Sequence, residues 1–173
     1  EDKRDYQVVE IDFPHMFAAV TSGRVDLASI SLPFSIAAED SGKVRTLFTM
    51  KDAIGESDMT VMAARASFIA AHRAAFVDFF ADAQRAMQWF LDPANRGAVV
   101  GIIAAATRKP DSFYSSWLFT KRDDYRDPLL KPNLEAVQRD VDRQVKLGFL
   151  KARIDVQKYA DLSLLREAAT RQK

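Results

Sequence analysis

Two short segments carry the side chains of this sequence that could bind a small molecule. Carboxylate, imidazole and hydroxyl groups in them could exchange hydrogen bonds with a ligand, and aromatic and aliphatic side chains could form apolar walls around it. The candidate ligand-binding residues are Asp12, Phe13, Pro14, His15, Met16, Ser29, Ser31, Leu32, Pro33 and Phe34.

The pattern between Val8 and Pro33 predicts the elements that would position these side chains. A β-branched run over residues 8–11 predicts a strand, and Pro14 occupies a position tolerated as the first residue of a helix. Asp12 or Phe13 would cap that helix, and Gly23 would end it in a left-handed conformation. A second strand over residues 25–30 would complete a parallel β-α-β unit, whose ligand site lies at the carboxyl ends of the strands.

The predicted helix start indicates what kind of ligand the segments would bind. Unpaired N–H groups and the positive end of the helix dipole favour an anionic group, to which His15 could donate while Phe13 stacks on the ligand. The structural alternative stays open, because Asp12 could simply cap the helix while Phe13 and Met16 pack. Likewise, the Ser31 hydroxyl could bond its own backbone instead of a ligand.

Beyond Pro33 the chain first continues the α/β pattern and then becomes helical. A helix over residues 34–40 closed by Gly42, followed by strands over residues 44–50 and 59–64, predicts an α/β fold with parallel β-α-β units. A helical carboxyl-terminal half then follows, with expected helices over residues 67–91, 95–106, 112–118, 133–147 and 164–170.

Composition narrows the possible functions. The 173 residues carry a formal net charge of +1, with basic and acidic residues mixed, so the total charge indicates neither a nucleic-acid partner nor an anionic membrane surface. There is no cysteine and only two histidines, far apart, which disfavours a disulfide, a metal site or a cysteine nucleophile. Gly-x-Ser-x-Gly, P-loop and Gly-x-Gly-x-x-Gly motifs are absent. We therefore expect a protein that is not an enzyme and needs no cofactor.

Several short patterns together resemble a known family. The first is Pro14-x5-Val20-x2-Gly23-x-Val25-Asp26-Leu27-Ala28, followed by Pro33 and Gly42-x-Val44-Arg45. Further patterns near the carboxyl end are Trp117-Leu118, Tyr125-Arg126-Asp127-Pro128, Gly148-Phe149-Leu150-Lys151, Asp155-Val156 and Tyr159-Ala160-Asp161-Leu162-Ser163. In order and spacing they resemble nitrate/sulfonate/taurine-type substrate-binding proteins of bacterial ABC importers, which are type II periplasmic binding proteins.

The resemblance implies a two-lobed clamshell that closes on a small solute and presents it to a permease. Residues 1–60 would be a remnant of the second α/β lobe, and residues 61–173 would return to pack helices on the first lobe. The amino-terminal half-lobe would be absent, which would also account for the lack of an export signal before Glu1. That lobe or a second chain would complete the site. The implied location is the periplasm, or the extracellular side with a lipid anchor.

Two other functions are compatible with the same broad fold. A ligand-sensing domain of a regulator could use similar lobes. Thiamine-pyrimidine synthases also resemble these binding proteins, but they depend on iron and on motifs that bear histidine and cysteine. The residues present here make this enzyme the less favoured alternative.

Overall fold

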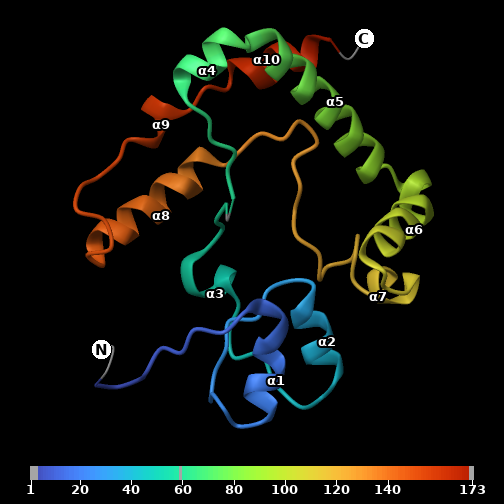
Figure 1. Cartoon of the computed structure of the whole chain (residues 1–173), viewed down its shortest axis with the longest axis vertical. Helices are drawn as coiled ribbons and strands as arrows, with labels where there is room; N and C mark the ends of the chain where they lie inside the picture. Colours follow the sequence, from blue (N-terminus) through green and yellow to red (C-terminus); the bar gives the residue numbers. More distant parts are fainter. Residues whose placement is uncertain (1–3, 59, 172–173) are drawn as a thin grey trace. The chain divides into compact units, whose positions relative to one another are not determined.

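The computed structural model describes residues 4–58 and 60–171 of the chain, and these residues are folded mainly into short helices joined by extended segments (Figure 1). The chain divides into two compact units, Glu1–Ala53 and Ile54–Lys173. We call them the amino-terminal unit and the helical unit and describe each by itself. The division concerns compactness alone, and the assignment of residues 1–60 and 61–173 to parts of two lobes remains a prediction.

The predicted α/β fold with parallel β-α-β units is wrong. Residues 4–58 and 60–171 contain no strand, only an isolated bridge position at Tyr6. The expected strands over residues 8–11 and 25–30 are irregular or extended segments, as are residues 44–49 and 60–64. Met50, the last residue of the expected strand over residues 44–50, begins a helix, and Met59 lies outside the described residues. The side chains of these segments are largely exposed, 71% for Val8 and 58% for Val61. Strand propensity needs a neighbouring strand and a buried face to be realised, and these runs have neither.

The amino-terminal unit contains helices whose ends the sequence predicted well. A 3-10 turn, η1 (Phe13–His15), leads into α1 (Met16–Thr21), and α2 (Phe34–Asp40) follows. The N–H of Arg24 bonds to the carbonyl of Ala19 at 2.9 Å, while Gly23 adopts a φ of 73°. The N–H of Gly23 bonds to the carbonyl of Val20 at 3.0 Å. A turn closed by these two hydrogen bonds requires a left-handed residue, which explains the glycine. Gly42 ends α2 in the same conformation, and α3 (Met50–Ile54) lies at the boundary of the unit.

The helical unit begins with a helix pair that was predicted as one helix over residues 67–91. The structure interrupts it at His72, whose φ of −124° and ψ of 27° are not helical. The unit comprises α4 (Ala66–Ala71), α5 (Arg73–Leu91), η2 (Pro93–Asn95), α6 (Arg96–Thr107), α7 (Asp111–Ser115), α8 (Leu134–Lys146), α9 (Val156–Tyr159) and α10 (Ser163–Thr170).

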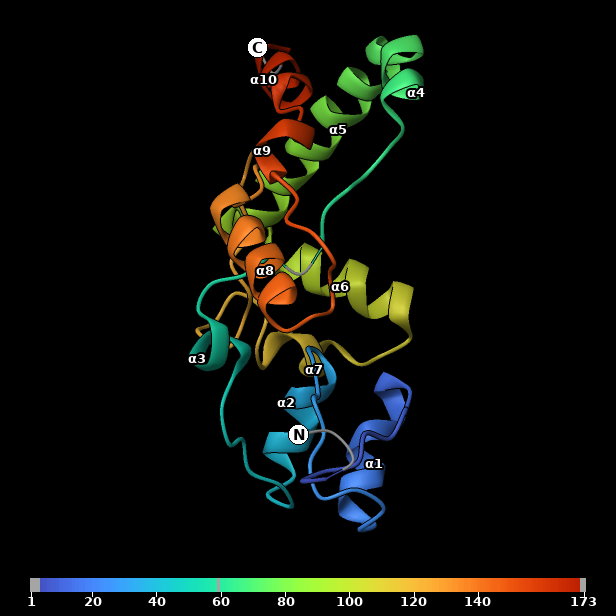
Figure 2. The same ribbon diagram turned by 90° about the vertical axis from the view of Figure 1, so that its left-hand side faces the viewer.

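Packing of α10 along α5 forms the core of the helical unit, and the two helices lie side by side in Figures 1 and 2. Small and branched residues of both helices meet there: Val77, Ala81, Leu164 and Ala168. Phe76 and Phe80 pack against this cluster from the same face of α5, as their spacing of four residues dictates. This close approach buries Gln84 completely, and its amide donates to the carbonyls of Leu129 and Leu165 at 3.0 and 3.1 Å.

A second cluster joins the end of α5 to the start of α6. The rings of Phe90 and Phe119 lie 5.0 Å apart, with the guanidinium of Arg126 over the first and that of Arg96 over the second. Phe119 has a φ of 63°, and its N–H donates to the Asp123 carboxylate at 2.8 Å. This hydrogen bond supports a left-handed conformation that an aromatic residue rarely adopts.

No helix among residues 4–58 and 60–171 has the length and apolar character that crossing a bilayer requires.

Candidate ligand-binding segments

The first candidate segment, residues 12–16, begins the short helix of the amino-terminal unit. Asp12 has the extended backbone of a cap, with ψ of 143°, and its carbonyl accepts from the N–H of His15 at 2.9 Å. Its carboxylate, however, makes no capping hydrogen bond. Since Pro14 lacks an N–H, one of the donors that such a cap would use is missing. The Asp12 carboxylate is therefore not engaged by the helix.

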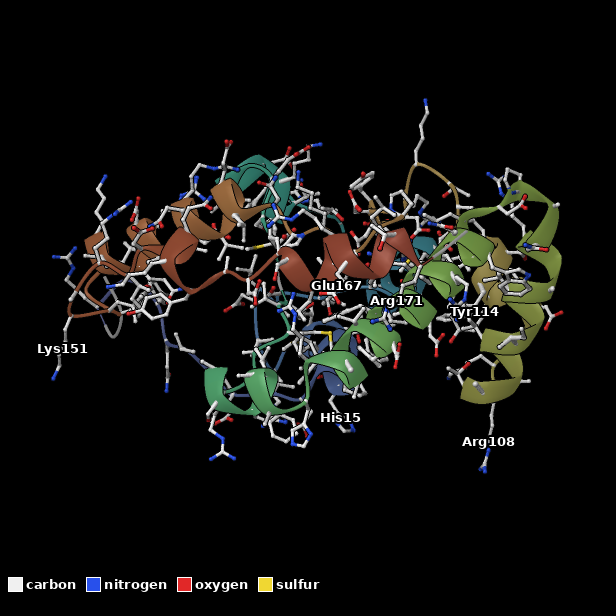
Figure 3. All side chains as sticks on the ribbon, turned by 90° about the horizontal axis from the view of Figure 1, so that it is seen from above. His15, Arg108, Tyr114, Lys151, Glu167 and Arg171 are labelled. Carbon is white, nitrogen blue, oxygen red and sulfur yellow. The ribbon has the colours of Figure 1, made fainter. Side chains whose placement is uncertain are left out.

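The side chains of the first segment are accessible. Phe13 is 52% exposed, Pro14 and His15 are exposed, and Met16 is half-buried. Figure 3 shows the imidazole of His15 projecting from the ribbon. A side chain in this setting can meet a ligand without displacing core residues.

The second candidate segment, residues 29–34, leads into α2. Ser29 is exposed, whereas Ser31, Leu32, Pro33 and Phe34 are half-buried. The carbonyl of Ser31 accepts from the N–H of Ser35 at 3.1 Å, and the Leu32–Pro33 peptide bond is cis. Within the described residues, the hydroxyls of Ser29 and Ser31 have no hydrogen-bond partner in the structure, so both groups could donate to a ligand.

Helix packing places the two segments at one end of the amino-terminal unit. Helices α1 and α2 contact one another, and each is preceded by one of the segments. Figure 1 shows both helices starting at the same end of this unit. Ala19, Ile36 and Ala38 are buried, which anchors the pair. The expected strands do not position the segments; the two helix starts do.

The polar groups at this end of the amino-terminal unit include an acceptor, Asp12, which a site that binds only inorganic anions would not contain. With six residues, α1 makes fewer than two turns, so the helix-dipole argument has little weight. The donors are instead the His15 imidazole and the two serine hydroxyls, with Asp12 as an acceptor. A free carboxylate repels a small inorganic anion, whereas an organic solute could offer Asp12 a donor and the serines an acidic group.

The structure gives no support for metal binding by these residues. Across residues 4–58 and 60–171, no group of three or more His, Asp or Glu side chains is arranged to hold a metal ion.

A local turn lowers the pKa of Asp52 in the amino-terminal unit. The N–H and the hydroxyl of Thr49 donate to its carboxylate at 2.8 and 2.7 Å and hold this pKa below its usual range.

Comparison with known proteins assigns the chain to a family. The model of the NMT1-like family matches residues 1–104, which include both candidate segments. Since this is more than half of the 173 residues, the chain belongs to the NMT1-like family. Membership of this broad family supports the resemblance to nitrate/sulfonate/taurine-type binding proteins and is consistent with a solute-binding role. No curated protein and no solved structure matches the chain.

Proposed function

We propose that the chain is a solute-binding component of an ABC importer, acting by binding rather than by catalysis. The observation that carries this proposal is that the NMT1-like match covers both candidate segments, which the packing of α1 and α2 brings to one end of a compact unit. In this proposal the partners are the solute, the permease of the importer, and a second lobe or chain that adds further ligand contacts. The two segments of this chain bind the solute by themselves, more weakly than the complete assembly would. The protein would act in the periplasm, or outside the cell on a lipid anchor.

The proposed solute is a small organic molecule that carries an acidic group, such as a sulfonate or a carboxylate. Its acidic oxygens would accept from His15, Ser29 and Ser31, and its apolar body would lie against Phe13 and Phe34. A donor group on the solute would face Asp12. Nitrate satisfies only the first of these three requirements, because it has neither an apolar body nor a donor.

A ligand screen on the full 173-residue chain tests the proposal. We expect aliphatic sulfonates or carboxylates to raise the melting temperature, since a ligand that binds the native state alone stabilises it. By isothermal titration, His15→Ala should weaken binding by about tenfold, the effect of losing a hydrogen bond to a charged group. His72→Ala is the matched control, because it removes the other histidine, which lies in the helical unit.

Two results would contradict the proposal. One is that no sulfonate, carboxylate or nitrate of the panel raises the melting temperature or gives heat on titration. The other is equal affinity of wild type, His15→Ala and the double variant Ser29→Ala/Ser31→Ala, which would leave the two segments with structural roles only.

A further inference from the structure

Helix α8 and the segment that leads from it to α9 form a hairpin. Side chains of α8 hold the returning segment in place. The Gln138 amide donates to the carbonyl of Ile154 at 3.1 Å, and its oxygen accepts from the N–H of Val156 at 2.9 Å. Arg153 adds a bond to Asp142 at 2.8 Å. These contacts hold both sides of the hairpin together and leave residues 146–151, which we call the hairpin tip, at its end.

Large apolar side chains of the hairpin tip are exposed. Leu147 and Phe149 are 69% and 77% exposed, on either side of Gly148, which has a φ of 80°. The N–H of Phe149 bonds to the carbonyl of Gln144 at 2.9 Å, the bond that closes a glycine-ended helix. An apolar residue at this position usually packs back onto its helix. Phe149 does not, so its ring is available to another apolar environment.

The charged side chains of residues 143–153 are all positive. Residues 143–153 carry four cations and no aspartate or glutamate, although the whole chain has a net charge of only +1. Arg143 and Arg153 pair with Asp140 and Asp142 of α8. Within the described residues, Lys146 and Lys151 have no ion-pair partner, and Figure 3 shows Lys151 extending outward from the ribbon.

We propose that the hairpin tip binds an anionic phospholipid surface. Leu147 and Phe149 would enter the headgroup region, while Lys146 and Lys151 would lie against lipid phosphates. Lysine suits this arrangement because its aliphatic stem follows the apolar surface while the ammonium stays at the polar boundary. A second copy of this chain is disfavoured as the occupant, since two identical tips would bring four unpaired lysines together. The inference does not depend on the proposed solute.

Vesicle sedimentation with the full chain tests this proposal. We expect binding to vesicles of mixed phosphatidylglycerol and phosphatidylcholine, little binding to pure phosphatidylcholine, and weakening as salt rises. Lys146→Gln/Lys151→Gln should lower the affinity roughly 25-fold, at about fivefold for each lysine. The control Lys109→Gln/Lys121→Gln changes the net charge equally at exposed positions outside the tip and should leave the affinity within about twofold of wild type.

A second pair of measurements separates insertion from simple charge attraction. Phe149→Ser should weaken binding at constant charge, and a tryptophan introduced by Phe149→Trp should be quenched by brominated acyl chains. The proposal is overturned by equal binding to neutral and anionic vesicles, by no binding to either, or by equal losses in the two lysine pairs. A lipid-free dimer that Phe149→Ser dissociates would also overturn it, in favour of self-association.

Discussion

Arg73 on α5 donates two hydrogen bonds to one carboxylate oxygen of Glu167 on α10, at 3.2 Å from Nε and at 2.9 Å from a terminal nitrogen. The same guanidinium donates to the Ser163 hydroxyl at 3.0 Å and lies 3.9 Å from an Asp161 oxygen. Arg171 and Asp78 form a further pair between the two helices, and Figure 3 labels Glu167 and Arg171 close together. Polar contacts therefore flank the apolar core of the α5–α10 pair.

Arg73→Gln should lower the free energy of unfolding by about 1 kcal/mol. The side chains of Arg73 and Glu167 are each 42% exposed, so water screens the pair and limits its value. Urea titration of the wild type, Arg73→Gln, Glu167→Gln and the double variant gives the coupling energy. The control Arg85→Gln breaks an exposed pair within α5 and should cost less than about 0.5 kcal/mol. Additive losses in the cycle would show that the pair itself contributes nothing.

Gln84→Ala should be among the most destabilising single changes in the helical unit, by about 2–4 kcal/mol. The substitution leaves a cavity and removes the donor from the carbonyls of Leu129 and Leu165. Urea denaturation measures the loss. The exposed Gln144→Ala on α8 is the matched control and should change stability by no more than about 0.5 kcal/mol. A comparable loss in both variants would contradict the role given to the buried amide.

The stability contributed by Asp161 should disappear in acid. The hydroxyl and then the N–H of Ser163 donate to Asp161 and hold its pKa below the usual value, with Arg73 and Arg166 adding smaller effects. Because the folded-state pKa is the lower one, this contribution is present above the unfolded pKa of about 3.9 and is lost as pH falls through the folded value. Asp161→Asn should thus be less stable than wild type at pH 6, with the difference shrinking towards pH 3. A constant difference in urea titrations would refute this linkage.

Trp117→Phe should cost much less than Trp117→Ala. Trp117 is buried, and its indole N–H has no hydrogen-bond acceptor in the structure. Phenylalanine removes that unpaired donor and keeps most of the buried ring, so we expect a loss below about 1.5 kcal/mol, against roughly 3–5 kcal/mol for alanine. Thermal unfolding of the two variants checks the order. Similar large losses would indicate that the N–H is bonded in solution.

The ends of helices were predictable because they depend on local chemistry. Gly23 and Gly42 end α1 and α2 as expected, and Gly148 follows α8 in the same left-handed conformation, which favours glycine. Asn133 begins α8, where its side chain accepts from the N–H of Ala136. The start of α10 shows the limit of this reasoning: the helix was expected over residues 164–170 but begins at Ser163, whose N–H donates to the Asp161 carboxylate.

Features that depend on distant partners were not predictable in the same way. Residues 44–50 have the composition of a strand, but within the described residues there is no neighbouring strand with which they could pair. The burial of Gln84 leaves no local signal in the sequence, because its partners lie 45 and 81 positions away. For the candidate site, Pro14 and Gly23 located the helix, whereas the unengaged carboxylate of Asp12 required the structure.

The cluster of Arg96, Phe119, Phe90 and Arg126 has a consequence for how the end of α5 aligns with the residues that follow it. Each ring contacts the other ring, tilted by 51°, and one guanidinium. Cation–π attraction depends on the cation lying over the ring face. Sliding residues 119–126 by one position along α5 would therefore break the ring contact and the cation contact together. The cluster thus specifies one alignment of these segments, which apolar burial alone, being non-directional, would not select.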